Sequence, residues 1–153
     1  MISLDVMALY SQHKNMVYRL ALSYLKSRAD AEDVTQQVFL RLLEYRGKIA
    51  PGKERSWLAA VTANLCRDTL RSAVRRLTQP LSEELVFEDE DQSEVFQAVM
   101  ELGEQERAAV YLYYYEGYDT KEIAQILKIS RTAVTTRLSR ARQHLKEKLE
   151  EIS

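Results

Sequence analysis

The sequence contains few residues that interrupt or cross-link helices: one cysteine, two prolines and four glycines in 153 residues. The single cysteine, Cys66, excludes an internal disulfide framework and suits a reducing cytoplasm. The scarcity of glycine, proline and phenylalanine, beside many leucines, alanines and glutamates, favours helix over sheet. No segment shows the alternation of apolar and polar residues that a strand requires. We therefore predict an all-α fold.

Long hydrophobic runs are also missing. The longest apolar-rich run, Met16 to Leu25, is interrupted by Arg19 and is far shorter than the about 20 residues of a membrane helix. The first residues, MISLDVMALYSQHK, have no basic leader before an apolar core, so we expect no signal peptide. We expect a cytoplasmic protein that does not itself insert into a membrane.

The formal net charge of −1 conceals a strong division of charge along the chain. Basic residues outnumber acidic ones in residues 1–80 and 107–153, whereas residues 81–106 contain ten acidic residues and no basic one. The segment PLSEELVFEDEDQSE predicts an acidic linker at residues 79–92, which like charges keep extended. The alternative is a cation site at residues 88–91, but the glycine and ligand spacing of a calcium loop are absent.

Apolar periodicity predicts three helices in a first domain, residues 1–78. The first covers about residues 4–26, the second begins after Ser27 and Arg28 and ends near residue 46, and the third covers about residues 55–77. Asp30 can cap the second helix. The glycines and proline of RGKIAPGKE predict a loop after this second helix. The apolar positions expected to pack together are Met7, Tyr10, Val17, Leu20, Ala21, Tyr24, Val34, Val38, Phe39, Leu42, Leu43, Leu58, Val61, Leu65 and Leu70.

A second domain, residues 93–153, is predicted to contain shorter helices and a helix-turn-helix. Asp119 and Glu122 have the spacing of a capping box, and Ile123, Ile126 and Leu127 give the following helix a buried face. After the turn KIS, Ser130 can cap a last helix from residue 131 to about 150. A capped helix, a three-residue turn and a second helix are typical of DNA-binding helix-turn-helix motifs.

The last helix has two contrasting faces. At 100° per residue, one side carries the apolar residues Val134, Leu138, Ala141, Leu145 and Leu149, and the other carries Thr132, Thr136, Ser139, Arg140 and Gln143. No acidic residue occurs in this helix before Glu147. Arginines and hydroxyls can hydrogen-bond base edges and phosphates, so the polar side favours DNA binding. The alternative is a solvated face, but such faces usually mix both signs of charge.

Three segments together resemble the extracytoplasmic function (ECF) subgroup of the sigma-70 family of bacterial RNA polymerase sigma factors. DAEDVTQQVFLRLLEY resembles region 2.2, and RSWLAAVTANLCRDTLRSAVRR resembles regions 2.3 and 2.4. The segment from LGEQERAAV to RQHLKEKL resembles region 4. The resemblance implies a region 2-like three-helix domain and a region 4-like helix-turn-helix domain. One departure is YLYYYEGY, where the family often has an arginine and this chain has Tyr113, Tyr114 and Tyr115.

The resemblance also implies roles for particular residues. Contacts to the −35 promoter element are implied for Arg131, Thr132, Thr135, Thr136, Ser139 and Arg140, with Arg137 and Arg142 placed for phosphates or intramolecular pairing. Contacts to −10 DNA, together with the loop at residues 46–54, are implied for Trp57, Asn64, Arg67, Arg71, Arg75 and Arg76. Contacts to core RNA polymerase are implied for Asp30, Glu32, Asp33, Gln36 and Gln37. Trp57 could instead be a core residue, and Asp30 and Asp33 could only cap a helix.

These expectations describe a promoter-specificity subunit with no catalytic residues, no metal and no cofactor. Its implied partners are promoter DNA, core RNA polymerase through the β′ clamp helices and the β flap, and an anti-sigma factor. The main alternative is a helix-turn-helix regulator that binds duplex DNA without being a polymerase subunit. An enzyme is a weaker alternative, because His13 and His144 are far apart in sequence and no phosphate-binding glycine loop occurs.

Overall fold

The computed structural model describes the backbone of residues 6–45, 49–76 and 94–152, and every regular element within these ranges is helical. The chain divides into two compact units, Met1–Glu84 (unit 1) and Leu85–Ser153 (unit 2). The all-α prediction is therefore confirmed. The linker predicted at residues 79–92 lies outside the described residues, as do both predicted domain boundaries nearest to it.

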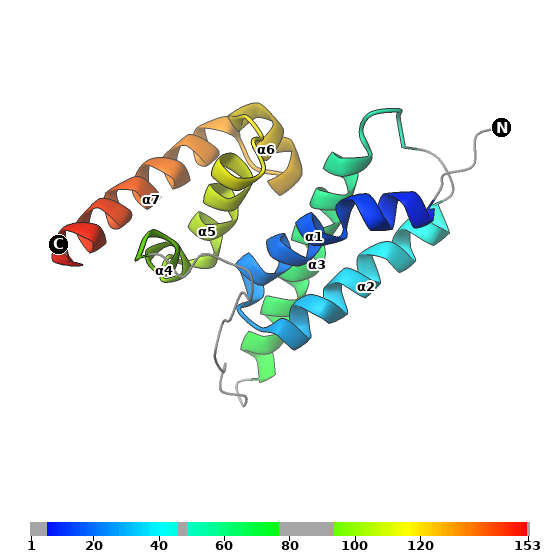
Figure 1. Cartoon of the computed structure of the whole chain (residues 1–153), viewed down its shortest axis with the longest axis horizontal. Coiled ribbons are helices and arrows are strands. Elements are labelled where there is room, and N and C mark those ends of the chain that lie inside the picture. The colour runs from blue at the N-terminus through cyan, green and yellow to red at the C-terminus, as the bar shows by residue number, and fades with distance from the viewer. Residues whose placement is uncertain (1–5, 46–48, 77–93, 153) are drawn as a thin grey trace. The chain divides into compact units, whose positions relative to one another are not determined.

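Unit 1 is built from α1 (Val6–Leu25), α2 (Arg28–Tyr45) and α3 (Glu54–Arg76), each of which packs against the other two. Figure 1 shows α1 and α2 side by side, with α3 crossing behind them. The chain reverses sharply after α1, where Lys26 adopts a left-handed conformation with a φ of 56°. Ser27 then caps α2, because its Oγ accepts a hydrogen bond from the Asp30 backbone N–H at 3.2 Å. The prediction that Asp30 is the cap was wrong.

The core of unit 1 contains most of the predicted apolar positions. Buried side chains from the three helices include Val17, Leu20, Ala21, Tyr24, Val34, Val38, Phe39, Leu42, Leu58 and Leu65. Val61 and Leu70 are only half-buried. Met7 and Leu43 were also predicted to pack inward, but they are 72% and 52% exposed. Met7 lies in the first turn of α1, and Leu43 lies on the outward side of α2, next to the buried Leu42.

Unit 2 contains α4 (Glu94–Met100), α5 (Glu104–Val110), the π-helical turn η1 (Tyr111–Tyr115), α6 (Thr120–Leu127) and α7 (Arg131–Ile152). The long α7 packs against α4, α5 and α6, as Figure 1 shows in orange and red. η1 continues α5 with wider turns, and the Glu116 N–H donates to the Tyr111 carbonyl five residues earlier. Gly117, at a φ of 75°, then ends the helical segment.

A buried arginine joins α5 to the turn that precedes it. Arg107 is only 4% exposed, and its Nη1 donates a hydrogen bond to the Leu102 carbonyl. Burial lowers the pKa of this guanidinium, and the nearby Glu104 carboxylate opposes that shift. The arginine thereby supplies a donor to a carbonyl at the end of the α4–α5 connection. None of the described helices is long and apolar enough to cross a membrane.

We predict that Arg107→Ala destabilises unit 2 by about 2–4 kcal/mol, because the Leu102 carbonyl loses its donor and a cavity opens beside it. Chemical denaturation followed by circular dichroism should show this loss, whereas the fluorescence of the single tryptophan, Trp57 in unit 1, should report an unchanged transition. The exposed Arg41 supplies a matched control, and Arg41→Ala should change stability by less than about 0.5 kcal/mol. Equal effects of the two substitutions would contradict the role assigned to Arg107.

Candidate nucleic-acid interface

Two helix caps define the helix-turn-helix in unit 2. The Glu122 N–H donates to Asp119 Oδ1 at 2.8 Å, and the Asp119 N–H donates to Glu122 Oε1 at 2.9 Å, which completes the predicted capping box. Lys128 ends α6 in a left-handed conformation with a φ of 59°. Ser130 caps α7 as predicted, since its Oγ accepts from the Ala133 N–H at 3.0 Å. The two caps and the left-handed residue set the angle at which α7 leaves the turn.

The buried stripe of α7 determines which side chains face outward. Val134, Leu138 and Ala141 are almost fully buried, whereas Leu145 and Leu149 are half-buried. The residues exposed on the remaining surface include Arg131, Thr132, Thr135, Thr136, Ser139, Arg140 and Gln143. All six side chains that the resemblance assigned to the −35 element are therefore accessible on one helix. This surface offers hydroxyl and guanidinium donors without an acidic side chain before Glu147.

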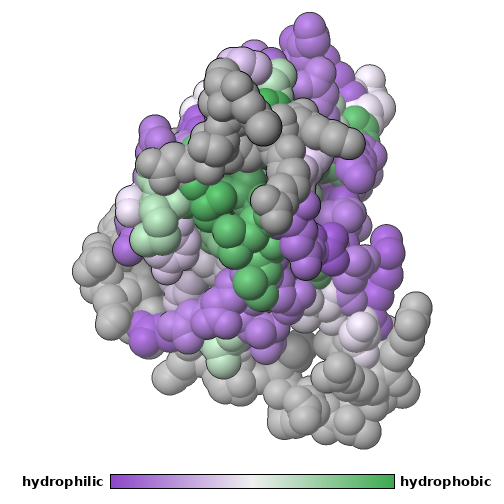
Figure 2. All heavy atoms as spheres, turned by 90° about the vertical axis from the view of Figure 1, so that its right-hand side faces the viewer, coloured by the Kyte–Doolittle hydropathy of each residue, from purple (hydrophilic) through white to green (hydrophobic). Residues whose placement is uncertain are grey.

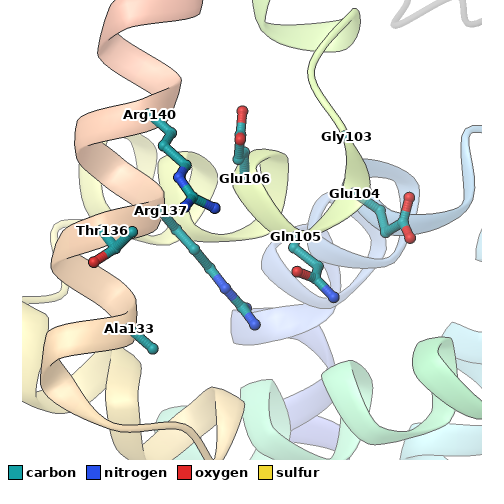
Figure 3. A pocket seen from close by; sticks show the side chains of 8 residues that line it. All are labelled: Gly103, Glu104, Gln105, Glu106, Ala133, Thr136, Arg137 and Arg140. Carbon is teal, nitrogen blue, oxygen red and sulfur yellow. The ribbon is translucent and has the colours of Figure 1, made fainter.

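Arginines on the two flanks of α7 have different surroundings. Arg131 Nε donates to Thr120 Oγ1 of α6 at 2.9 Å, so the side chain is held beside the turn. On the other flank, Arg137 and Arg140 line an open hollow of about 450 Å³ between α7 and the start of α5. Figure 3 shows both arginines extending from α7 toward Glu104, Gln105 and Glu106, while Thr136 points the other way. The Glu106 carboxylate also accepts from His144 Nδ1 at 2.9 Å if that nitrogen carries the proton.

A second polar face lies on α3 in unit 1. Trp57, Asn64, Arg67 and Arg71 follow a spacing of seven, three and four residues, which places them on one side of the helix. Arg67 Nη2 donates to Asn64 Oδ1 at 3.2 Å, and the exposed Arg71 lies 3.5 Å from Asp68. Arg75 and Arg76 belong to the last turn of α3, but their side chains lie outside the described residues. The arrangement presents cations and an amide along about two turns of helix.

Trp57 combines both of the environments considered for it. Its ring packs against Tyr45 of α2, with ring centroids 4.9 Å apart, and the residue is half-buried. The remaining exposed part of the ring can stack against an unpaired base. The loop preceding α3 contains Gly52 in a left-handed conformation, with a φ of 83°. Residues 46–48 of the predicted base-binding loop lie outside the described residues.

The outward face of α2 is acidic at its start and apolar at its end. Asp30, Glu32, Asp33 and Gln36 are exposed, and Gln37 Nε2 donates to Asp33 Oδ2 at 2.7 Å. Because Ser27 provides the cap, the Asp30 carboxylate is not needed for that role. Leu40 and Leu43 follow Gln36 at four and seven residues, on the same side of the helix, and both are more than half exposed.

Exposed hydrophobic residues gather where α1 begins and α2 ends. Figure 2, which views the molecule from that side, shows a hydrophobic patch with polar residues below it and to its right. The large apolar side chains exposed in these two helices are Met7, Tyr10, Leu40 and Leu43. The sequence pattern missed this surface because it assigned Met7, Tyr10 and Leu43 to the core. A patch of this kind with a polar rim is typical of a protein-binding surface.

The fold and these surfaces define a helix-turn-helix protein with a second helical unit, and comparison with known proteins supports the same class. Residues 9–76 match the family Sigma-70 region 2, and residues 92–145 match the family Sigma-70, region 4. The ECF RNA polymerase sigma factor SigM of Bacillus subtilis (strain 168) is 31% identical over 150 residues, which cover 90% of this chain and 91% of that protein.

The same family includes longer relatives. The chain is 32% identical over 154 residues to the ECF RNA polymerase sigma factor SigE of Mycolicibacterium smegmatis, but it spans only 60% of that protein's length. Among solved structures, the sigma factor RpoE of Bartonella quintana, in complex with the anti-sigma factor NepR, has a similar fold. Its TM-score is 0.82 at 20% identity, over 95% of this chain and 97% of that one. This chain therefore belongs to the ECF subgroup of the sigma-70 family.

We predict that Arg140→Ala changes base preference at one position of the −35 element and weakens binding there by about 1–3 kcal/mol, the contribution of a bidentate contact to guanine. The measurement is the binding of the polymerase complex to a promoter set with single base-pair changes across that element. Arg137→Ala is the matched control, because Arg137 lines the same hollow but lies closer to the buried stripe. A uniform loss over all promoters for Arg140→Ala would mean that it contacts only the backbone.

Proposed function

We propose that this chain is a promoter-specificity subunit of bacterial RNA polymerase. In this proposal α7 binds the −35 element in the major groove, and the polar face of α3 with the loop before it stabilises unpaired −10 DNA. The observation that carries it is the surface of α7 before Glu147, which is cationic and has no acidic side chain. The buried stripe and two helix caps turn this surface outward. The two family matches, in the order region 2 and then region 4, support the same division of labour.

The outward face of α2 is the proposed contact with core RNA polymerase. Its carboxylates and amides, from Asp30 to Gln37, can pair with basic groups of the β′ clamp helices, and the exposed Leu40 and Leu43 can add apolar contact. A further contact of unit 2 with the β flap belongs to the same proposal. The polymerase carries out bond formation, so we propose no catalytic site, metal or cofactor for this chain.

Separate DNA-binding units give the complex its specificity. Each small unit makes few DNA contacts. The polymerase holds the two units at the separation of the two promoter elements, so that their affinities combine. Ten acidic residues in the segment 81–106 oppose binding of the free chain to DNA. We propose that the protein acts in the cytoplasm and that an anti-sigma factor controls it, as the solved complex of RpoE with NepR illustrates for another protein of this fold.

Run-off transcription with core polymerase on genomic fragments tests the proposal. Addition of the protein should produce discrete transcripts that core polymerase alone does not make. A helix-turn-helix regulator acting alone would instead bind duplex fragments without core polymerase and would leave the start sites of core polymerase unchanged. That result would reject the proposed function.

The polymerase contact has its own test. Replacing Asp33 and Gln36 together with alanine should abolish binding to core polymerase, because both exposed side chains lie on the proposed contact face. Helicity should persist, since alanine favours helix at exposed positions. Gln12→Ala with Asn15→Ala on α1 is a control pair of exposed polar residues in the same unit. Retained polymerase binding by the Asp33/Gln36 variant, measured by co-purification with core enzyme, would reject this surface.

A further inference from the structure

Arg142 and two tyrosines form a cluster on one flank of α7, which we call the Arg142 clamp. Arg142 Nε donates to Tyr114 Oη at 2.7 Å, across 28 residues of sequence. The guanidinium carbon lies 5.9 Å and 5.8 Å from the ring centroids of Tyr113 and Tyr114, within range of a cation–π interaction. The two rings also contact each other edge to face, with centroids 4.9 Å apart. These contacts hold the arginine in one orientation.

The contacts leave the end of the guanidinium free to bind another group. Arginine has five N–H donors, of which the clamp uses the one on Nε. Within the described part of the chain, no hydrogen bond or ion pair involves the terminal nitrogens of Arg142. Both Arg142 and Tyr114 are exposed. Because the Tyr114 oxygen accepts from Arg142, its own hydrogen remains available, so the Tyr114 O–H and the terminal guanidinium N–H groups can all donate to a ligand. Such an arrangement fits an anion.

The Arg142 clamp lies at the end of a strip of side chains on α7. Arg131, Thr135, Ser139 and Arg142 follow one another at four, four and three residues, so they lie on one side of the helix. Arg131, at the other end, is held in a similar way through its Nε by the Thr120 hydroxyl. The two arginines are about 16 Å apart along the helix axis. This separation exceeds the about 12 Å width of the major groove, so the strip is long enough to reach both of its walls.

We propose that the Arg142 clamp binds a backbone phosphate at one wall of the major groove, while Arg131 reaches the opposite wall. The clamp provides a cation next to the tyrosines that occupy the position where the family often has an arginine. A pre-oriented guanidinium loses little conformational entropy when it binds a phosphate. The inference rests on the proposed function of α7 and adds an element that positions the helix without reading bases.

The test uses the full chain assembled with core polymerase and measures binding to a promoter fragment at several salt concentrations. Arg142→Ala should reduce the slope of log K against log salt by about 1, the effect of losing one phosphate contact. The loss should be the same for promoters with altered −35 bases. Lys148→Ala removes an equal charge from the same helix, where Lys148 pairs with Glu101 at 2.6 Å, and it should leave the slope unchanged.

Promoters carrying one neutral methylphosphonate at successive positions identify the contact directly. With the unaltered protein, replacement of the bound phosphate should weaken binding about tenfold. With Arg142→Ala, that same replacement should have no further effect. Tyr114→Phe keeps the charge but removes the hydroxyl, so it should weaken binding less than Arg142→Ala and preserve the salt slope.

Two results separate the possible failures. If the unaltered protein directs transcription, but Arg142→Ala changes neither the salt slope nor the methylphosphonate pattern, the clamp only joins α7 to η1 and the inference is wrong. A lowered denaturation midpoint without a change in slope would overturn it in the same way. If the unaltered protein directs no promoter-specific transcription, the proposed function fails, and this inference fails with it.

Discussion

The burial of one narrow stripe on α7 is the constraint on which the candidate interface of unit 2 depends. Val134, Leu138 and Ala141 can leave water only if α7 takes one rotation about its own axis. That rotation turns Thr132, Thr136 and Ser139 outward. The capping box of α6 and the Ser130 cap then fix where the helix begins. The burial of this apolar stripe therefore decides which side chains of α7 are available to contact bases.

Unit 1 carries opposite charges on two of its helices. Exposed acidic and amide side chains lie at the start of α2, whereas α3 presents Arg67, Arg71 and the partly exposed Trp57. A carboxylate-rich surface repels phosphates and favours basic protein surfaces, and the cationic face of α3 has the reverse preference. Two helices of a small unit can in this way recognise a protein and a nucleic acid without competition between the two surfaces.

Local features of the fold could be predicted from the sequence because they depend on neighbouring residues. The Asp119–Glu122 capping box and the Ser130 cap both follow from residue types three positions apart. Local patterns also misled: Asp30 is a residue type that often caps helices, but α2 begins at Arg28, so Ser27 stands in the cap position. Periodicity likewise assigned Leu43 to the core, but Leu43 lies on the outward side of α2, whereas its neighbour Leu42 is buried.

Features that depend on tertiary contact could not be predicted. The bond from Arg131 to Thr120 spans 11 residues, and the bond from Arg142 to Tyr114 spans 28. Nothing in the spacing of the tyrosine run identified Arg142 as the arginine that it holds. The π-helical turn at Tyr111–Tyr115 has no local signature either, because its widened hydrogen bonding satisfies the end of α5 within a packed unit.

The orientation of α7 on DNA is the central claim, and a single introduced cysteine can measure it. Cys66 is fully buried, and burial raises the pKa of its thiol to about 12, so a DNA-cleaving or crosslinking probe will label only an added cysteine. A probe on Ser139→Cys, in complex with core polymerase, should modify the −35 element. A probe on Lys148→Cys should modify it far less, because Lys148 pairs with Glu101, in the connection between α4 and α5. Equal modification from both positions, or none from Ser139→Cys while transcription persists, would contradict the account.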